Sequence, residues 1–232
     1  MKEENLHKGH RARMKKQFLD MGIETFEEHQ ILELLLFFAI PQHDTNEYAH
    51  NLINRFGDLH SVFSARYEDL KTVDGIGDNA ATLLKLIPEL CVKLNAEKRL
   101  GTVLDTSESL VEFFKTQFFG VPDEEIKLAC FDDRLKLLDI VLINKGDIGS
   151  VRLDARKVFQ EILRTNCSQI IISHNHPIGN AQPSPADILI TKTVQDMIKP
   201  MDVTLLDHIV VGTDGVHFIL ANKFYPHKSK DE

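Results

Sequence analysis

The sequence predicts an α/β or α+β domain with a mixed sheet, preceded by a small all-helical domain. First, 43% of the 232 residues are hydrophobic and 27% are charged, which is typical of globular chains. Second, residues 1–97 contain only segments of helical character. Third, strand-like segments alternate with helices from residue 106 onward. With a linker at 98–105, the predicted domains are residues 1–101 and 102–232.

In the first domain we expect short helices that end at glycine or proline. A polar, basic stretch at 10–20 comes first. The expected helices then cover residues 26–40, 45–56 and 67–72, and a last helix runs from the turn at 73–80 to about residue 96. The helix at 26–40 is apolar on nearly all faces, so we expect it to be buried, and Pro41 ends it. Thr45 is the expected N-cap of the next helix and Gly57 stops it.

In the second domain we expect helices packed on a sheet. The helices cover residues 106–118, 154–165 and 184–198, and the strands cover residues 125–131, 136–143, 169–172, 203–211 and 216–220. The tail after Tyr225 is polar, and we expect it to be frayed.

Charge and cysteine usage narrow the class of protein. Lys plus Arg is 27 and Asp plus Glu is 35, so the net charge is −8, a poor match to a non-specific nucleic-acid coat. The three cysteines are widely spaced and form no CxxC pair, which indicates a reducing compartment. The longest apolar run, 31–40, is about half of a membrane span, and the N-terminus has no secretory h-region. We therefore expect a soluble, cytoplasmic protein with no membrane partner.

The strongest chemical signal is a pair of histidines followed by a serine and an aspartate. His174 and His176 are two residues apart at the end of an apolar strand, which puts both imidazoles on one side. Ser184 begins the next helix, and Asp187 lies in its first turn. Two histidines and one carboxylate suit a catalytic zinc with an open fourth position. Ser184 and Asp187 also fit a capping box, which explains them without a metal and is compatible with one.

This motif, His-x-His-x7-Ser-x2-Asp, resembles the signature of the JAMM (MPN-type) metalloprotease domains. The string around it resembles the bacterial RadC branch of that superfamily. Other matching stretches occur along most of the chain: GHRxR at 9–13, ELL at 33–35, FGDL at 56–59, GIG at 75–77 and LLDHI at 205–209. The chain departs from the branch at Ile178, where serine is usual, and at 152–157, where a His-Pro-Arg-Glu string is usual. Neither departure removes a ligand, but both lie in loops that we expect to border the site, so they concern substrate recognition.

The resemblance implies a zinc-dependent metalloprotease-like hydrolase of amide or isopeptide bonds, acting on a protein or peptide. His174, His176 and Asp187 would bind Zn²⁺. An upstream glutamate, Glu125 or alternatively Glu124, would take a proton from zinc-bound water, and Ser184 would stabilise the oxyanion. The branch is associated with DNA repair, and such domains often work in partnerships, so a homo-oligomer is conceivable. Asp207 has two possible roles: its carboxylate could support a metal-bound histidine, or it could be a buried polar group with no part in the site.

A second signal resembles a helix-hairpin-helix. Gly75 and Gly77 allow a close backbone approach to DNA phosphates, but Asp78 caps the following helix where a phosphate would dock. The basic stretch 8–16 is another candidate DNA contact. The alternative function is therefore a DNA-associated accessory protein whose zinc domain is structural or nucleolytic. Against it, 13 Lys and Arg face 16 Asp and Glu in residues 1–101, and 14 face 19 in residues 102–232.

Overall fold

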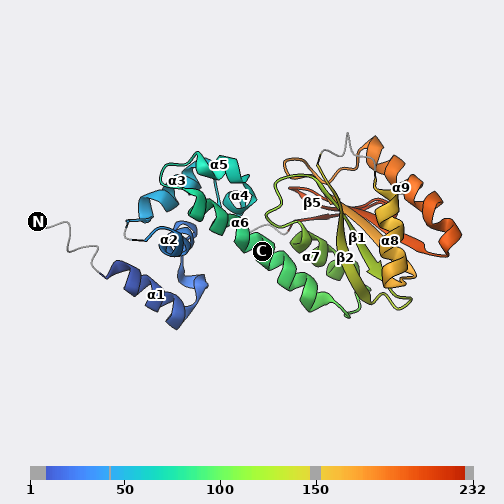
Figure 1. Ribbon diagram of the computed structural model, residues 1–232, viewed down its shortest axis with the longest axis horizontal. Coiled ribbons are helices and arrows are strands. Elements are labelled where there is room, and N and C mark those ends of the chain that lie inside the picture. Colours follow the sequence, from blue (N-terminus) through green and yellow to red (C-terminus); the bar gives the residue numbers. More distant parts are fainter. Residues whose placement is uncertain (1–8, 42, 147–152, 228–232) are drawn as a thin grey trace, which may run out of the picture. The chain divides into compact units, whose positions relative to one another are not determined.

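The chain forms two compact units in a computed structural model that describes residues 9–41, 43–146 and 153–227 (Figure 1). The first unit is Met1–Leu90 and the second is Cys91–Glu232. This division falls inside a 22-residue helix, α6 (Asp78–Arg99), which begins in one unit and ends in the other. The predicted linker at 98–105 lies beyond the division, and its backbone joins the second unit, where Val103 forms a bridge with Lys136.

The first unit is helical throughout its described residues. Its elements are α1 (His10–Met21), the 3-10 turn η1 (Ile23–Thr25), α2 (Glu28–Ala39), α3 (Asn46–Phe56), α4 (Leu59–Ser64), α5 (Tyr67–Lys71) and the start of α6. The hydrophobic helix α2 is buried through Leu32 and Leu36, as its apolar pattern predicts. The hydrophobic pattern of the sequence did not predict α4, because its six residues are too few to show a helical period. That helix depends on its N-cap, since the Asp58 side chain accepts a 2.7 Å hydrogen bond from the Ser61 amide.

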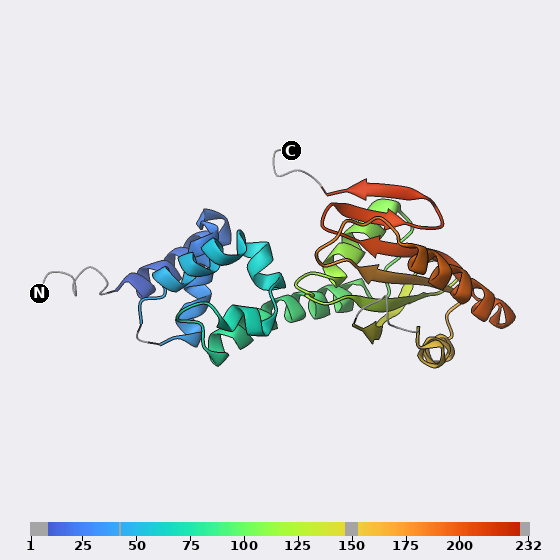
Figure 2. The ribbon, with the colours of Figure 1, turned by 90° about the horizontal axis from the view of Figure 1, so that it is seen from above.

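The second unit is a mixed six-stranded sheet with helices on both faces (Figures 1 and 2). Its strands, in the order β2-β1-β3-β4-β5-β6, are antiparallel except for the parallel pair β3 and β4. The helices are α7 (Ser107–Gln117), α8 (Ala155–Thr165) and α9 (Pro185–Ile198), with a 3-10 turn η2 (Lys199–Met201). The strands are β1 (Glu125–Phe131), β2 (Leu137–Lys145), β3 (Gln169–Asn175), β4 (Thr204–Val211), β5 (Gly215–Phe218) and β6 (Lys223–Pro226). The predicted class, an α+β mixed-sheet domain after a helical one, is confirmed.

Each face of this sheet is covered by its own hydrophobic cluster. Phe113 and Phe114 of α7 pack on one face, and their cluster includes Ala129 of β1. Val158 of α8 and Val194 of α9 pack on the other face, together with their own sheet residues. Strand β1 is therefore buried along its whole length. Alternate residues of β1 and β3 point to different helices, and this alternation decides which side chains reach the candidate site.

The expectation for the C-terminal end of the sheet needs correction. The strand expected at 216–220 ends at Phe218, and an unexpected sixth strand, β6, follows; most of the tail expected to be frayed, residues 228–232, lies outside the described residues. β6 pairs antiparallel with β5, with Val216 opposite Tyr225. Its residues are largely exposed, so no alternation of polar and apolar residues revealed it.

Across the described ranges, none of the helices combines the length and the apolar character that crossing a bilayer requires.

Candidate metal centre

The histidine pair and the aspartate of the motif converge at the end of β3. His174 lies near the end of that strand, His176 follows it, and Asp187 is in the first turn of α9. The two Nε2 atoms of the histidines are 3.1 Å apart. Asp187 Oδ1 lies 3.3 Å from His174 Nε2, and Asp187 Oδ2 lies 3.8 Å from His176 Nε2. One potential ligand atom from each residue thus lies within 4.8 Å of the others.

These residues fit a tetrahedral zinc ion. Ligand atoms about 2.0–2.1 Å from zinc lie about 3.3 Å from one another in a tetrahedron, close to the observed spacings. Asp187 Oδ1 is buried and has no hydrogen-bond partner, an arrangement that is costly unless something else satisfies the oxygen. Two facing ring nitrogens and an orphaned carboxylate oxygen form a donor set that one cation would satisfy.

The protonation states of these residues also suit a metal. Burial lowers the pKa of His174, an effect that outweighs the contact with Asp187 and the charge of Glu124, both of which raise it. For Asp187, burial raises the pKa, but His174 and the hydrogen bonds from Ser184 outweigh burial and hold it well below its usual range. The imidazole of His174 is thus neutral and the carboxylate is charged near neutral pH, which are the forms that bind metal.

The loop between His176 and Ser184 is anchored from both sides. His176 Nδ1 donates a 2.8 Å hydrogen bond to the Asn180 carbonyl, which leaves the Nε2 lone pair for a ligand. The Ala181 amide donates to Asp214 Oδ1 at 2.8 Å. Beside it, a Cβ added at Gly212 would lie 2.1 Å from the Ala181 nitrogen, so only glycine permits this approach. The anchored loop holds His176 in place.

Ser184 forms the capping box that the sequence allowed. Its hydroxyl donates a 2.7 Å hydrogen bond to Asp187 Oδ2, and its amide donates to the same oxygen at 2.7 Å. The Asp187 amide in turn donates to Ser184 Oγ at 3.2 Å. Helix capping therefore aims the other oxygen, Oδ1, at the histidines, so that one carboxylate both caps the helix and completes the donor set.

The two candidate glutamates lie at the start of β1, with Glu124 directly before the strand and Glu125 as its first residue. Ile126 of β1 pairs with His174 and packs in the cluster of α8 and α9, so alternation places Glu124 on the His174 side. The charge of Glu124 also contributes to the pKa of His174. Glu125 points the other way, where its carboxylate lies 3.7 Å from Lys127 Nζ and 3.3 Å from Lys145 Nζ. Of the two residues, Glu124 is therefore the one whose charge acts on His174.

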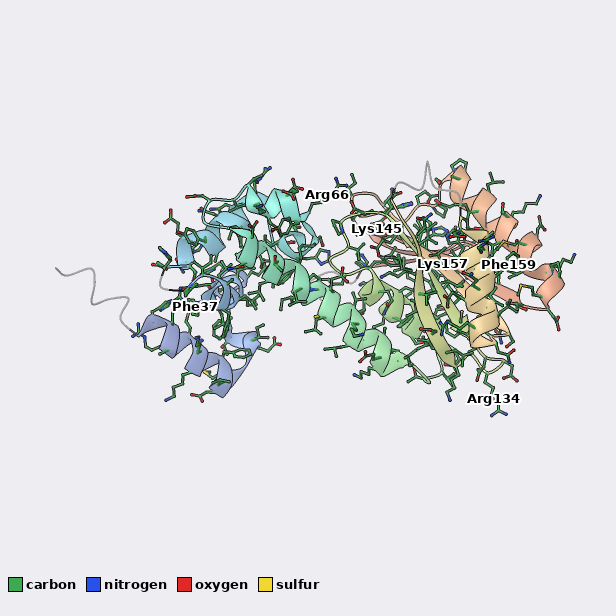
Figure 3. All side chains as sticks on the ribbon, viewed as in Figure 1. Phe37, Arg66, Arg134, Lys145, Lys157 and Phe159 are labelled. Atoms are coloured by element: carbon green, nitrogen blue, oxygen red, sulfur yellow. The ribbon has the colours of Figure 1, made fainter. Side chains whose placement is uncertain are left out.

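Lys145 marks the end of the edge strand β2 (Figure 3). Its ammonium lies 3.8 Å from Asp123 as well as 3.3 Å from Glu125. Together with the buried Lys127, it holds the Glu125 side chain in ion pairs. These ion pairs give Glu125 a structural role.

Asn175, the residue between the two histidines, holds the segment that carries Glu124. Its Oδ1 accepts a 2.8 Å hydrogen bond from the Glu125 amide, and its Nδ2 donates to the Asp123 carbonyl at 3.1 Å. The Glu124 carbonyl accepts a 2.9 Å bond from the Gly146 amide. The main chain on both sides of Glu124 is therefore fixed. The sequence reasoning passed over Asn175, although its place between the histidines was a signal.

Of the two neighbouring residues of β4, His208 contacts His174 and Asp207 does not, so the structural alternative holds for Asp207. Asp207 accepts hydrogen bonds from the amides of His208, Leu220 and Ala221, at 2.8, 2.9 and 3.1 Å, and thereby holds the turn after β5. His208 Nε2 lies 2.8 Å from His174 Nδ1, and burial lowers the pKa of His208 to about 3. Because the two residues alternate along β4, only one of them can face the site.

The hairpin and the basic stretch have structural partners in the first unit. Asp78 lies 2.7 Å from Lys71 Nζ and accepts a 2.9 Å hydrogen bond from the Tyr67 hydroxyl. Those two bonds hold the pKa of Asp78 below its usual value. A Cβ at Gly75 would lie 2.2 Å from the Tyr48 ring, so this glycine permits packing within the unit. In the basic stretch, Arg11 donates to main-chain carbonyls at the end of α2, while Lys8 lies outside the described residues.

Taken together, the mixed sheet, its flanking helices and the convergent His174, His176 and Asp187 are features of a JAB (JAMM-type) hydrolase-like fold. A family model described as the RadC-like JAB domain matches residues 104–224, more than half of the chain. The chain therefore belongs to the RadC family.

Relatives resemble this chain over most of its length. A UPF0758 protein of Fusobacterium nucleatum is 29% identical over 213 residues, covering 88% of this chain and 92% of that protein. A UPF0758 protein of Paraburkholderia xenovorans is 28% identical over 204 residues, covering 88% of this chain and 81% of that protein. A UPF0758 protein of Ruegeria pomeroyi is also 28% identical over 204 residues, covering 88% and 91%. The likeness includes the helical unit as well as the matched domain.

Proposed function

We propose that this chain is a zinc-dependent metallohydrolase of amide or isopeptide bonds, acting on a protein or peptide. The observation that carries the proposal is the convergence of two ring nitrogens on a buried carboxylate oxygen that has no hydrogen-bond partner. His174, His176 and Asp187 would hold the ion. Bound zinc would supply a Lewis acid and lower the pKa of a coordinated water toward neutrality.

The protein's own residues would supply the proton transfer and the positioning. We assign the general base to Glu124, because its side of the strand is the side of His174 and its main chain is held by Asn175 and Gly146. Ser184 is proposed to stabilise the oxyanion from beside the ligand Asp187. Its hydroxyl, which donates to Asp187 Oδ2, would have to turn toward the substrate to do so.

Three further parts of the proposal concern the cell. We propose a cytoplasmic location, because the three cysteines are free and form no CxxC pair. We also propose a link to DNA repair, supported only by the association that the resemblance to the RadC branch carries. Any DNA contact would fall to the first unit, and assembly with a second copy of the chain is part of the same proposal.

The test is to measure zinc per chain in wild-type protein and in His176→Ala, and then to screen both for hydrolysis of peptides, isopeptides and nucleic acids. The proposal expects about one zinc in wild type, little in the variant, and peptide or isopeptide cleavage by wild type alone. Absence of near-stoichiometric zinc after titration would refute it. Zinc binding without hydrolysis, or with cleavage of nucleic acid, would favour a DNA-associated accessory protein.

A further inference from the structure

A chain of hydrogen bonds runs from the helix that carries Asp187, through a buried threonine and a buried histidine, to His174. Thr191 Oγ1 lies 2.7 Å from the Asp187 main-chain carbonyl and 2.8 Å from His208 Nδ1. His208 Nε2 lies 2.8 Å from His174 Nδ1. All four residues are buried. The chain joins α9, β4 and β3, three elements that are distant in the sequence.

The direction of each hydrogen bond follows from one fixed acceptor. The Asp187 carbonyl carries no hydrogen, so the Thr191 hydroxyl must donate to it, and that uses the only hydroxyl proton. The lone pair left on Thr191 Oγ1 then accepts the proton of His208 Nδ1. A neutral His208 with its proton on Nδ1 has only a lone pair on Nε2, which accepts from His174 Nδ1.

At His174 the consequence is a single tautomer. With its proton on Nδ1, the ring presents the Nε2 lone pair to His176 and Asp187. The other tautomer would place a proton on Nε2, where a metal would bind, and two lone pairs would face each other across the 2.8 Å between His174 and His208. In the assigned tautomer, the Nε2 lone pairs of His174 and His176 face each other at 3.1 Å beside the Asp187 carboxylate, an arrangement that a bound cation would satisfy. Selection of a ligating tautomer by the bond at the other ring nitrogen is a general feature of metal-bound histidines.

We propose that Thr191 and His208 are positioning residues that keep His174 in its metal-binding tautomer. The role in metal binding rests on the proposed function, whereas the tautomer itself is a property of the metal-free chain. Thr191 lies four residues after Asp187, the last residue of the motif, and nothing in the motif assigns it a role. Here its hydroxyl is the starting point that sets the proton positions of two histidines.

The test compares three variants of α9. Thr191→Val keeps the shape but removes the hydroxyl, and Thr191→Ser restores it. Thr193→Val is the matched control, since Thr193 Oγ1 makes the same type of bond to a preceding carbonyl, Leu189 O, at 2.8 Å on the exposed side of the helix. Zinc affinity is measured by competition with a chromophoric chelator. We expect Thr191→Val to bind zinc about 10–100-fold more weakly, which is the usual effect of removing a residue that supports a metal ligand. The other two variants should bind zinc with near wild-type affinity.

A second measurement separates this inference from the proposed function. Imidazole ¹⁵N spectra of the metal-free wild-type protein should show His174 with its proton on Nδ1, and Thr191→Val should show a mixture of tautomers. A wild-type protein that has this tautomer but binds no zinc would refute the proposed function and leave the positioning role standing. An Nε2–H tautomer in wild type, or Thr191→Val with wild-type zinc affinity in a protein that binds zinc, would overturn the inference.

Discussion

Glu124 and Glu125 are adjacent in the sequence, yet the structure gives them different environments. Because β1 is covered by helices on both faces, a shift of one residue moves a side chain from the α8 and α9 side to the α7 side. Lys127 and Lys145 fix Glu125 on the second side. The acidic cluster alone could not choose between the two residues, since neither periodicity nor charge distinguishes them. The pairing of Ile126 with His174 favours Glu124.

We predict that Glu124→Gln lowers amide or isopeptide hydrolysis by about 10²–10⁴-fold, the usual contribution of a positioned base, and leaves zinc content near wild type. Glu125→Gln should retain most of the activity and lower the free energy of unfolding by about 1–3 kcal/mol, because it weakens two ion pairs. Turnover of the substrate that wild type cleaves, zinc content and denaturant unfolding provide the comparison. The reverse pattern, with Glu125→Gln inactive and Glu124→Gln active, would return the base to Glu125.

How much of the site the sequence could predict depends on the distance along the chain. His174, His176, Ser184 and Asp187 lie within 14 residues, and one strand, one turn and one capped helix bring them together. Local rules therefore placed them correctly beside one another. His208 meets His174, and Thr191 meets His208, only because β3 and β4 are parallel neighbours and α9 packs over them. No spacing in the sequence encodes that contact, and for this reason only Asp207 was weighed as a support for a metal-bound histidine.

At the scale of elements, the basic stretch shows how a functional and a structural explanation can compete. Arg11 of α1 donates hydrogen bonds to the carbonyls of Phe37 at 3.2 Å and Ile40 at 2.8 Å, and also to the His43 carbonyl. These carbonyls lie at and beyond the end of α2, where the helix has no partners of its own. A guanidinium placed there also complements the helix dipole. Arg11 thus ties α1 to the C-terminus of the most hydrophobic helix.

We therefore predict that Arg11→Ala lowers the free energy of unfolding by about 2–3 kcal/mol, because three carbonyls lose a charged donor. Lys16→Ala, an exposed position on the same helix, is the control and should change stability by less than about 0.5 kcal/mol. Urea unfolding of both variants, followed by circular dichroism, measures the effect. If the two variants instead have equal stability and both lose a salt-dependent affinity for duplex DNA, the stretch is a DNA contact and the structural explanation fails.

For the whole molecule, the division into two units has a thermodynamic consequence for a metal. All three proposed ligands belong to the second unit, Cys91–Glu232, and none belongs to the first. The donor set also carries an uncompensated cost in the metal-free protein, since Asp187 Oδ1 is buried without a hydrogen bond. A cation that binds only the folded state would remove this cost and stabilise the unit that supplies its ligands.

We predict that zinc at about 100 times its dissociation constant stabilises the second unit by about 2.7 kcal/mol, since the gain follows from the ratio of ligand to dissociation constant. For a unit of this size, the unfolding midpoint should rise by roughly 10 °C. Hydrogen exchange followed by mass spectrometry, with zinc or with a chelator, locates the gain in protection. Peptides from β3 and α9 should be protected most, and those from α2 and α3 least. His176→Ala should abolish the difference, while His50→Ala, a histidine of the first unit, should preserve it. Equal protection by zinc in wild type and His176→Ala would mean that the ion binds elsewhere on the chain.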